Sequence, residues 1–271
     1  MNQRRIYSRR RNPQRKPASP LVQITLPDKP LISVIIPTKN EEKLLEQCLV
    51  QFAAPIKNRF GIELIVSDGG STDNTIGIAA AYADFIATHE GPWRQTIAEG
   101  RNRGAELAHA DLLMFVNADT TIANVGQFLD RAIQRFAVDQ SIAAIATRVE
   151  VDQQERRWTD IIFHWYFNHY VRIANWIGLG MGRGECQIVR RNAFEALGGY
   201  NPQMAAGEDF DLYHRLRSIG RVKFDSRLLV YESPRRYRKY GYANVYSDWI
   251  RNGFAVLLHH RSSNQTWDEV R

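Results

Sequence analysis

Residues 31–42 of the chain read LISVIIPTKNEE, and this stretch decides the predicted fold. Leu31–Ile36 is a mainly apolar, β-branched run that ends at Pro37, with polar residues directly after it. An apolar run without regular polar alternation is typical of a strand that is covered on both faces of its sheet. The stretch therefore predicts a buried strand that opens into a polar turn at its carboxyl end.

The same pattern repeats along the first half of the chain, with helical periodicity between the apolar runs. Further strands are predicted at 62–66, 84–87, 112–116 and 142–147, and helices at 44–52, 71–82, 95–109 and 126–136. Strands that alternate with helices form right-handed crossovers and a parallel sheet. We therefore expect the α/β class: a Rossmann-like, mostly parallel sheet flanked by helices.

Polar residues gather where the predicted strands end. Thr38 and Asn40 follow the first strand, Asp68 follows the second, and Asp119 follows the strand at 112–116. The carboxyl ends of parallel strands share one rim of a sheet, and ligands bind outside that rim. The sequence thus predicts one cleft that these side chains line.

The second half of the chain is less regular. Helices are predicted at 158–176, 192–197 and 208–218, with a strand at 186–189 between them. We expect three segments, namely a disordered basic tail (1–28), a nucleotide-sugar-binding half (29–150) and an acceptor-binding half with a C-terminal helical segment (151–271).

The charge of the chain is concentrated in the predicted tail. The formal net charge is +7, residues 4–16 supply seven basic side chains, and the remaining 29 basic residues equal the 29 acidic ones in number. A neutral body argues against nucleic acid as the main partner. The tail suits an anionic membrane surface or is a solvated segment without a role. Cys48 and Cys186 have no metal-ligand spacing, and we expect a cytoplasmic protein, peripheral to the membrane if the tail binds lipid.

Two of the polar turns have chemistry of interest. Asp119, in Asn117-Ala-Asp119, suits Mg²⁺ or Mn²⁺, which use one or two protein carboxylates and complete their shell with phosphate oxygens and water. The alternative is a carboxylate that caps the next helix. Residues 67–73, SDGGSTD, place glycines after a strand, where backbone can approach a ligand closely, although a plain turn with a helix cap is the other interpretation.

Three charged segments remain. Residues 101–104, RNRG, could grip phosphate or face solvent. Glu208 and Asp209 begin a predicted helix, where they supply an ionised base or merely an acidic first turn. The run RRYRKY at 235–240 is interpreted as a surface charge run, with a grip on a diphosphate or an anionic acceptor as the alternative.

Taken in order, these segments resemble the family-two glycosyltransferases of the GT-A fold. The resemblance covers roughly residues 31–225. Its motifs are SVIIPTKNEE at 33–42, SDGGSTDNT at 67–75, RNRG at 101–104, NAD at 117–119, and GGY at 198–200 followed by Glu208-Asp209. Each motif is weak alone, but the ordered set is specific.

The resemblance implies a role for each matched position. The nucleotide-sugar pocket would be lined by Pro37, Thr38, Asn40, Glu41, Asp68, Gly70, Arg101, Asn102 and Asn117. Asp119 would bind the Mg²⁺ or Mn²⁺ ion, and Asp209 would be the general base, with Glu208 as its neighbour or rival. Asn117 stands where the family's Asp-x-Asp motif has its first carboxylate, so the site has one negative charge fewer.

The predicted function is an inverting, metal-assisted transfer of a sugar from a nucleoside-diphosphate sugar to an acceptor hydroxyl. The acceptor is a glycan, a lipid-linked molecule or a small molecule. Two alternatives are nucleotidyl transfer onto a sugar phosphate and non-catalytic binding of a nucleotide-sugar. The first lacks the glycine-rich loop expected after the first strand, where the chain has Pro37-Thr-Lys-Asn40, and the second is favoured by Asn117.

Overall fold

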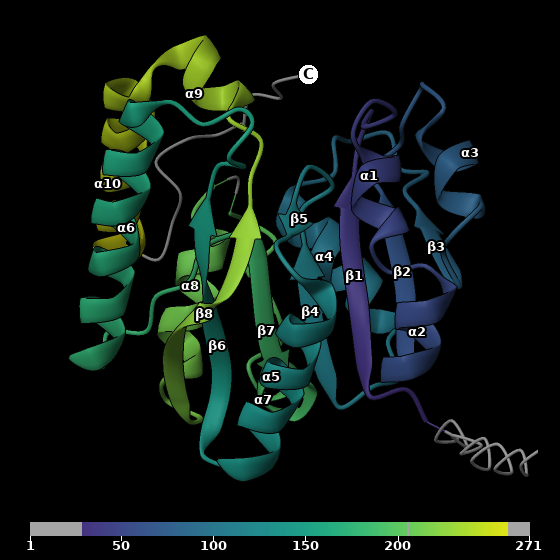
Figure 1. The fold of residues 1–271 in the computed structure, drawn as a ribbon, viewed down its shortest axis with the longest axis horizontal. Coiled ribbons are helices and arrows are strands. Elements are labelled where there is room, and N and C mark those ends of the chain that lie inside the picture. Colours follow the sequence, from purple (N-terminus) through teal and green to yellow (C-terminus); the bar gives the residue numbers. More distant parts are fainter. Residues whose placement is uncertain (1–28, 205, 260–271) are drawn as a thin grey trace, which may run out of the picture.

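The computed structural model describes residues 29–204 and 206–259. The predicted basic tail, including residues 4–16, lies outside the described residues. Eight strands form one sheet in the order β3-β2-β1-β4-β7-β6-β8-β5 (Figure 1). The strands are β1 (Ile32–Thr38), β2 (Ile62–Asp68), β3 (Phe85–Thr88), β4 (Leu112–Val116), β5 (Thr121–Ile122), β6 (Ile142–Glu150), β7 (Cys186–Arg190) and β8 (Arg221–Tyr231).

Ten helices flank this sheet within the described residues. They are α1 (Leu45–Val50), α2 (Ala54–Phe60), α3 (Thr75–Ala80), α4 (Ile97–Glu106), α5 (Val125–Val138), α6 (Trp158–Trp176), α7 (Arg191–Ala196), α8 (Glu208–Leu216), α9 (Arg235–Tyr240) and α10 (Tyr242–His259). The prediction of a mostly parallel α/β sheet is confirmed. Every predicted strand and helix is present. Helices α9 and α10 lie in the C-terminal part that was predicted to be helical without bounds, while α2, β5 and β8 were not predicted.

The strand order reverses beside β1. Strands β2 and β3 follow β1 on one side, and β4 pairs with β1 in parallel on the other. The crevice between β1 and β4 is therefore the topological switch point, where ligands of open α/β sheets bind. Thr38 and Asp68 are the last residues of β1 and β2, and Asn40 and Asp119 follow β1 and β4, so the fold brings these four residues to one rim.

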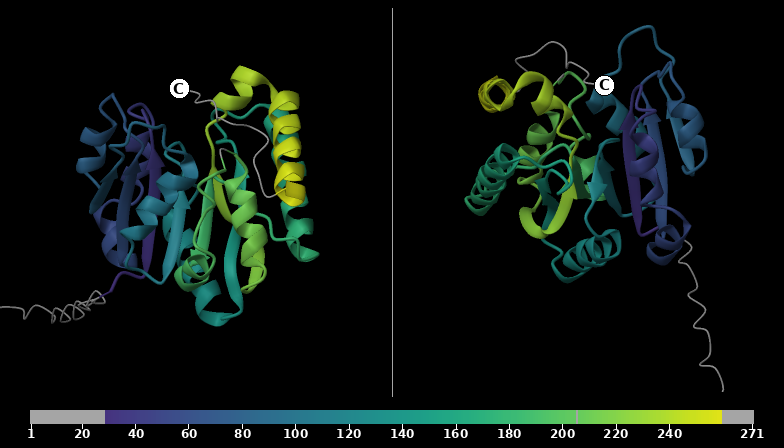
Figure 2. Two further views of the ribbon diagram at one scale, coloured as in Figure 1. Left: turned by 180° about the vertical axis from the view of Figure 1, so that it is seen from behind. Right: turned by 45° about the horizontal axis from the view of Figure 1, so that its top comes forward.

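The sheet is covered on both faces, as the unbroken apolar runs require. Ile32, Val34 and Ile36 of β1 pack with α1, α2 and α5, whereas Ile35 packs on the face of α4, α7 and α8. Strand β7 runs antiparallel between β4 and β6 and so joins the two predicted halves into one continuous sheet. Figures 1 and 2 show α6 and α10 side by side, at the end of the molecule remote from β1 and β2.

No helix among the described residues is both long enough and apolar enough to span a bilayer.

Candidate active site

The turns after β1 and β2 are locked to each other by hydrogen bonds. Asn40 adopts a left-handed φ of 52°, its Oδ1 accepts from the Thr72 N–H at 2.8 Å, and its own N–H donates to Ser71 Oγ at 2.7 Å. The Glu41 N–H donates to Thr75 Oγ1 at 2.8 Å. Side-chain oxygens thus satisfy the exposed backbone of both turns, and the rim beside β1 is held rigid before any ligand arrives.

Asp68 organises the second turn. Its carboxylate accepts from the N–H groups of Gly70 and Ser71 at 2.9 and 2.8 Å, from Thr38 Oγ1 at 3.3 Å, and from the Ser71 hydroxyl. Gly70 has φ of 84°, which a side chain would strain. Asp68 therefore lies at the predicted rim with its acceptor positions engaged by its own turn.

Arg101 lies at the centre of the candidate site. Helix α4 can approach β1 closely because Gly104 has no side chain. A Cβ at this position would lie only 2.4 Å from Ile35 Cγ2. This packing presents Arg101 at the rim, where its side chain is fully buried.

The Arg101 guanidinium joins three of the predicted motifs. Nη1 donates to Glu208 Oε1 at 2.8 Å, and Nη2 donates to Asn117 Oδ1 at 3.0 Å and to the Gly184 carbonyl at 2.9 Å. Its Cζ also lies 5.2 Å from the centre of the Tyr200 ring. Arg101 thus ties the turn after β4 to the start of α8.

Asn102, the next residue of α4, is engaged in the same region. Its Nδ2 donates to the Tyr200 carbonyl at 2.8 Å, and its Oδ1 accepts from the Tyr200 N–H at 2.9 Å. The amide therefore clamps the backbone of the predicted GGY motif onto α4. The contacts of Arg101 and Asn102 with the protein were not apparent from the sequence, because their partners lie far along the chain.

Asp119 follows β4 and is partly buried. Its Oδ2 lies 3.0 Å from Arg235 Nη2, and the same guanidinium makes a two-pronged bond to Glu41, at 2.8 and 3.1 Å. Burial raises the pKa of Asp119, the positive charge of Arg235 opposes this, and the charges of Glu41 and Glu185 add to the rise. A cation is thus already favoured at this carboxylate by the negative charges around it.

The interpretation of residues 235–240 as a surface charge run is wrong in part. Arg235 contacts Asp119 and Glu41, Tyr237 is buried, and Arg238 pairs with the buried Asp160. The acidic partners of Arg235 and Arg238 lie more than seventy residues away along the chain, so no local pattern could reveal them.

Glu208 and Asp209 begin α8 directly after Gly207, which has a left-handed φ of 79°. Glu208 is buried against Arg101, and a Cβ on Gly184 would lie 3.3 Å from Asp209 Oδ2 and 3.2 Å from Arg101 Nη2. Asp209 is therefore close to the Arg101 guanidinium. Burial and the negative charge of Glu208 raise the pKa of Asp209 to about 7, although Arg101 opposes the rise. A carboxyl that titrates near neutral pH can serve as a general base.

A second buried charge cluster, which sequence reasoning missed, lies behind these residues. Arg183 Nη2 donates to Glu185 Oε1 at 2.9 Å and to Glu232 Oε1 at 2.6 Å, and Tyr237 donates to the same Glu232 oxygen at 2.9 Å. The Glu185 carbonyl also accepts from the Asn117 N–H at 3.1 Å. The cluster links the turn after β4 to β8 and α9.

Few carboxylates are available for a metal. No group of three or more His, Cys, Asp or Glu side chains that could hold an ion occurs among the described residues. Asp119 can supply one carboxylate, whereas the Asn117 amide oxygen is engaged by Arg101. This donor set fits an ion that takes most of its ligands from a diphosphate and from water, as Mg²⁺ and Mn²⁺ do.

Sequence comparison finds relatives that are named as glycosyltransferases. Over 113 residues the chain is 34% identical to validoxylamine A glucosyltransferase of Streptomyces hygroscopicus subsp. limoneus, which covers 40% of this chain and 24% of that protein. Over 109 residues it is 36% identical to a PGL/p-HBAD biosynthesis glycosyltransferase of Mycobacterium bovis, covering 37% of this chain and 42% of the relative. The matched region thus spans less than half of either relative.

Solved structures share the fold over most of the chain. The mannosyltransferase PcManGT of Pyrobaculum calidifontis, in complex with GDP-Man and Mn²⁺, aligns with a TM-score of 0.66 and 20% identity, over 85% of this chain and 64% of that one. Glucosyl-3-phosphoglycerate synthase of Mycobacterium tuberculosis, in complex with Mn²⁺, UDP and glucosyl-3-phosphoglycerate, aligns at 0.57 and 19%, over 84% and 79%. These likenesses confirm the predicted GT-A fold.

The family assignment rests on a longer match than either curated relative gives. The model described as "Glycosyl transferase family 2" matches residues 33–198, which is more than half of the chain and includes the turns at Asn40, Asp68 and Asp119. The chain belongs to glycosyl transferase family 2.

Proposed function

We propose that the protein transfers a sugar from a nucleoside-diphosphate sugar to an acceptor hydroxyl, with inversion at the anomeric carbon. One observation carries the proposal: Arg101 bonds Asn117, which shares the turn after β4 with Asp119, and also bonds Glu208, the neighbour of Asp209, whose pKa is about 7. Through these two bonds Arg101 would hold the donor side and the base next to each other. The structural neighbours support the donor class, since their complexes contain GDP-Man, UDP-GlcNAc or UDP.

On the donor side, we assign the nucleotide to the rim beside β1. Pro37, Thr38, Asn40 and Glu41 would line one wall, and Asp68 and Gly70 the other. Because the two turns are cross-bonded in advance, little conformational entropy is lost there on binding, which favours affinity. Arg101, Asn102 and Asn117 would form the floor under the donor sugar.

Asp119 would hold the divalent cation, Mg²⁺ or Mn²⁺. When bound, the ion supplies positive charge that stabilises the departing nucleoside diphosphate. When the ion binds, Arg235 must give up its ion pair with Asp119 and contact another anion. The diphosphate of the donor is the expected partner, because arginine binds phosphate in a two-pronged manner. Arg235 would then add to the positive charge around the leaving group.

Asp209 would remove the proton from the acceptor hydroxyl. A single base suits a single in-line displacement through an oxocarbenium-like transition state, which inverts the anomeric configuration. Glu208 is bound to Arg101, and its negative charge raises the pKa of Asp209. Glu208 would therefore position Arg101 and tune Asp209.

We assign the acceptor, whether a glycan, a lipid-linked molecule or a small molecule, to the half formed by residues 151–271. Residues 29–150 would hold the donor. A cytoplasmic location, with the basic segment 4–16 drawn to an anionic membrane surface, is part of the same proposal.

A panel of nucleotide-sugars with Mn²⁺ tests the proposal. Native protein should release nucleoside diphosphate and, with a suitable acceptor, yield a product of inverted configuration by NMR. Asp119→Ala should lose most of this activity, and full activity in that variant would reject the metal role. Release of pyrophosphate from a nucleoside triphosphate in the presence of a sugar phosphate would indicate nucleotidyl transfer instead. Donor binding without turnover across many acceptors would indicate a non-catalytic binder.

A further inference from the structure

Helix α6 presents an apolar face to solvent. Its inner side packs on the sheet through Phe167, Val171 and Ala174, which are buried. Its outer side exposes large apolar groups at helical spacing, with Trp165 62% and Trp176 85% exposed. The exposed set on α6 is Trp158, Ile161, Ile162, Trp165, Tyr166, Tyr170, Ile173 and Trp176. A contiguous apolar patch of this kind marks an interaction surface.

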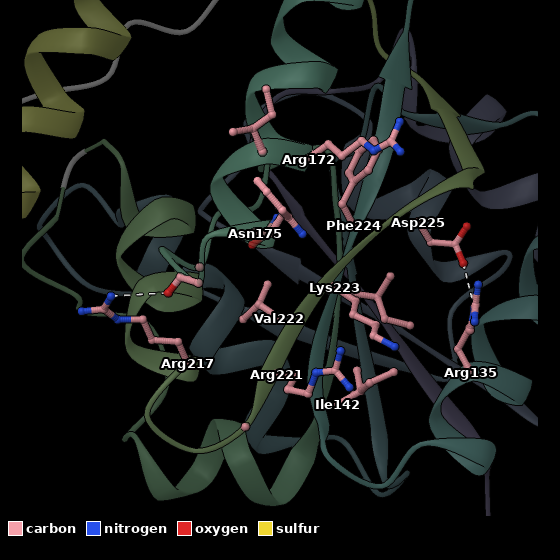
Figure 3. Close-up of a pocket in the computed structure, with 16 residues that line it drawn as sticks. Arg135, Ile142, Arg172, Asn175, Arg217, Arg221, Val222, Lys223, Phe224 and Asp225 are labelled. Atoms are coloured by element: carbon pink, nitrogen blue, oxygen red, sulfur yellow. Dashed lines mark hydrogen bonds and ion pairs between the residues drawn. The ribbon is translucent and has the colours of Figure 1, made fainter.

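A basic cavity adjoins the end of this face. It measures about 830 Å³ and lies between the last turns of α6, the start of β8 and α5 (Figure 3). Its lining includes five basic side chains and one acidic one, Asp225. The basic residues are Arg135, Arg172, Arg217, Arg221 and Lys223. A second cavity of about 340 Å³ shares Arg172 and Phe224 and continues along α6, so we call the two together the α6 groove.

The positive charge of the α6 groove is only partly neutralised within the protein. Arg221 and Lys223 share one carboxylate, Asp139, and Arg135 shares Asp225 with Arg131. Arg172 and Arg217 are both exposed, and neither has a carboxylate partner among the described residues. The groove therefore carries a net positive charge directly beside exposed indole rings.

We propose that the outer face of α6 and the α6 groove form a docking surface for an anionic lipid bilayer. Indole and phenol rings on the face of a helix lie favourably at the level of lipid headgroups, where one end of the ring is apolar and the other is wet. Arginine binds lipid phosphate in a two-pronged manner, which suits Arg172 and Arg217, because neither has a carboxylate partner within the part of the chain that the structure describes. A soluble protein partner would not require this combination of a basic cavity with five exposed aromatic rings along one helix. The proposal does not rest on the sugar-transfer activity.

Vesicle sedimentation with the full chain tests the proposal. The protein should bind vesicles of phosphatidylcholine with phosphatidylglycerol, bind pure phosphatidylcholine weakly, and dissociate as salt is raised. The double variant Arg172→Gln/Arg217→Gln should bind about thirtyfold more weakly, because each basic residue at an anionic surface contributes a factor of about five. The matched control Lys57→Gln/Arg59→Gln removes two charges from α2, at the opposite end of the molecule, and should bind as the native protein does.

The apolar part is tested with Trp165→Ser/Trp176→Ser, against Trp93→Ser as a control that removes an exposed indole outside α6. The α6 variant should lose vesicle binding and lose the quenching of tryptophan fluorescence by brominated lipid, whereas the control should keep both. These side chains are exposed, so circular dichroism and thermal unfolding should report an intact fold.

Four results would overturn the proposal. Undiminished vesicle binding by both α6 variants is one. Loss of binding only when Arg9, Arg10 and Arg11 are replaced by Gln would assign the membrane contact to the N-terminal segment. Displacement of the protein from vesicles by millimolar inorganic phosphate, or a fall in molar mass of the α6 variants by light scattering, would indicate a free-phosphate site or a contact between copies of the chain.

Discussion

At the scale of single residues, Asp209 is the most informative group, because it is the proposed base and its raised pKa also affects stability. Its pKa is raised to about 7, so the carboxylate that accepts a proton is present mainly above this pH and is lost below it. The transfer rate should therefore rise with pH through about 7. Asp209→Asn should lower the rate by roughly 10²–10⁴-fold and abolish this rise, with donor binding by calorimetry retained. A variant with the native pH profile would show that another group is the base.

The same pKa predicts an effect on folding stability. Between the usual pKa of 3.8 and about 7, the folded protein holds a proton that the unfolded chain has released. The free energy of unfolding contributed by this group therefore falls as pH rises through that window. Asp209→Asn should be more stable than native protein at pH 8, by at most roughly 4 kcal/mol at 1.36 kcal/mol per pH unit, and the difference should vanish near pH 4. Urea unfolding at both pH values measures it; equal stability at pH 8 would contradict the raised pKa.

Arg101 is a structural link between α4 and α8 as well as a proposed site residue. Arg101→Met would leave the buried Glu208 carboxylate without its partner, and breaking a buried pair in this way costs roughly 3–5 kcal/mol. Arg103→Met, two residues along α4 and exposed, should change the free energy of unfolding by less than about 1 kcal/mol. The double variant Arg101→Met/Glu208→Gln should recover part of the loss, because no charge is then left unpaired. A cost for Arg101→Met equal to that of the control would refute the link.

At the scale of elements, the contact between α4 and β1 fixes where Arg101 lies. Gly104→Ala would bring a methyl group within 2.4 Å of the buried Ile35, so α4 must shift and the free energy of unfolding should fall by about 1–3 kcal/mol. Gly126→Ala in α5 meets nothing closer than 3.8 Å and should change it by no more than about 1 kcal/mol, with alanine favouring the helix. Thermal or urea unfolding compares the two. Equal effects would mean that α4 is not closely packed on β1.

The elements that sequence reasoning recovered are those with a local signal. β4 and α6 were predicted with the bounds that the structure has, because one is an unbroken apolar run and the other a long aromatic helix. β8 was missed because charged residues interrupt it and its pairing with β6 shifts register between Thr147 and Arg148. A bulge breaks the two-residue alternation by which a strand is recognised.

At the scale of the whole molecule, the residues of the candidate site also fall into two groups: those that a local sequence pattern could predict and those that it could not. Asn40, Asp68 and Asp119 were predicted to share a rim because parallel strands end together, which a pattern along the chain can reveal. Arg235, Glu185 and Glu232 escaped prediction because their contacts depend on how β8 and α9 return to the rim. The fold class was thus accessible from local periodicity, whereas the charge network of the site was a consequence of tertiary packing.

One continuous sheet also predicts how the molecule responds to a ligand. β7 bonds to β4 on one side and β6 on the other, and Arg101 connects both halves, so the described residues should unfold in a single transition. A nucleoside diphosphate with Mn²⁺ at about a hundred times its dissociation constant stabilises the folded state by about 2.7 kcal/mol. For a domain of this size the melting temperature should rise by roughly 5–10 °C. Asp119→Ala should keep only the rise that the nucleotide gives without metal, while Asp130→Ala, an exposed carboxylate on α5, should keep the full rise. Two separate transitions, of which only one moves, would show that the halves fold independently and that donor binding is not transmitted through the sheet.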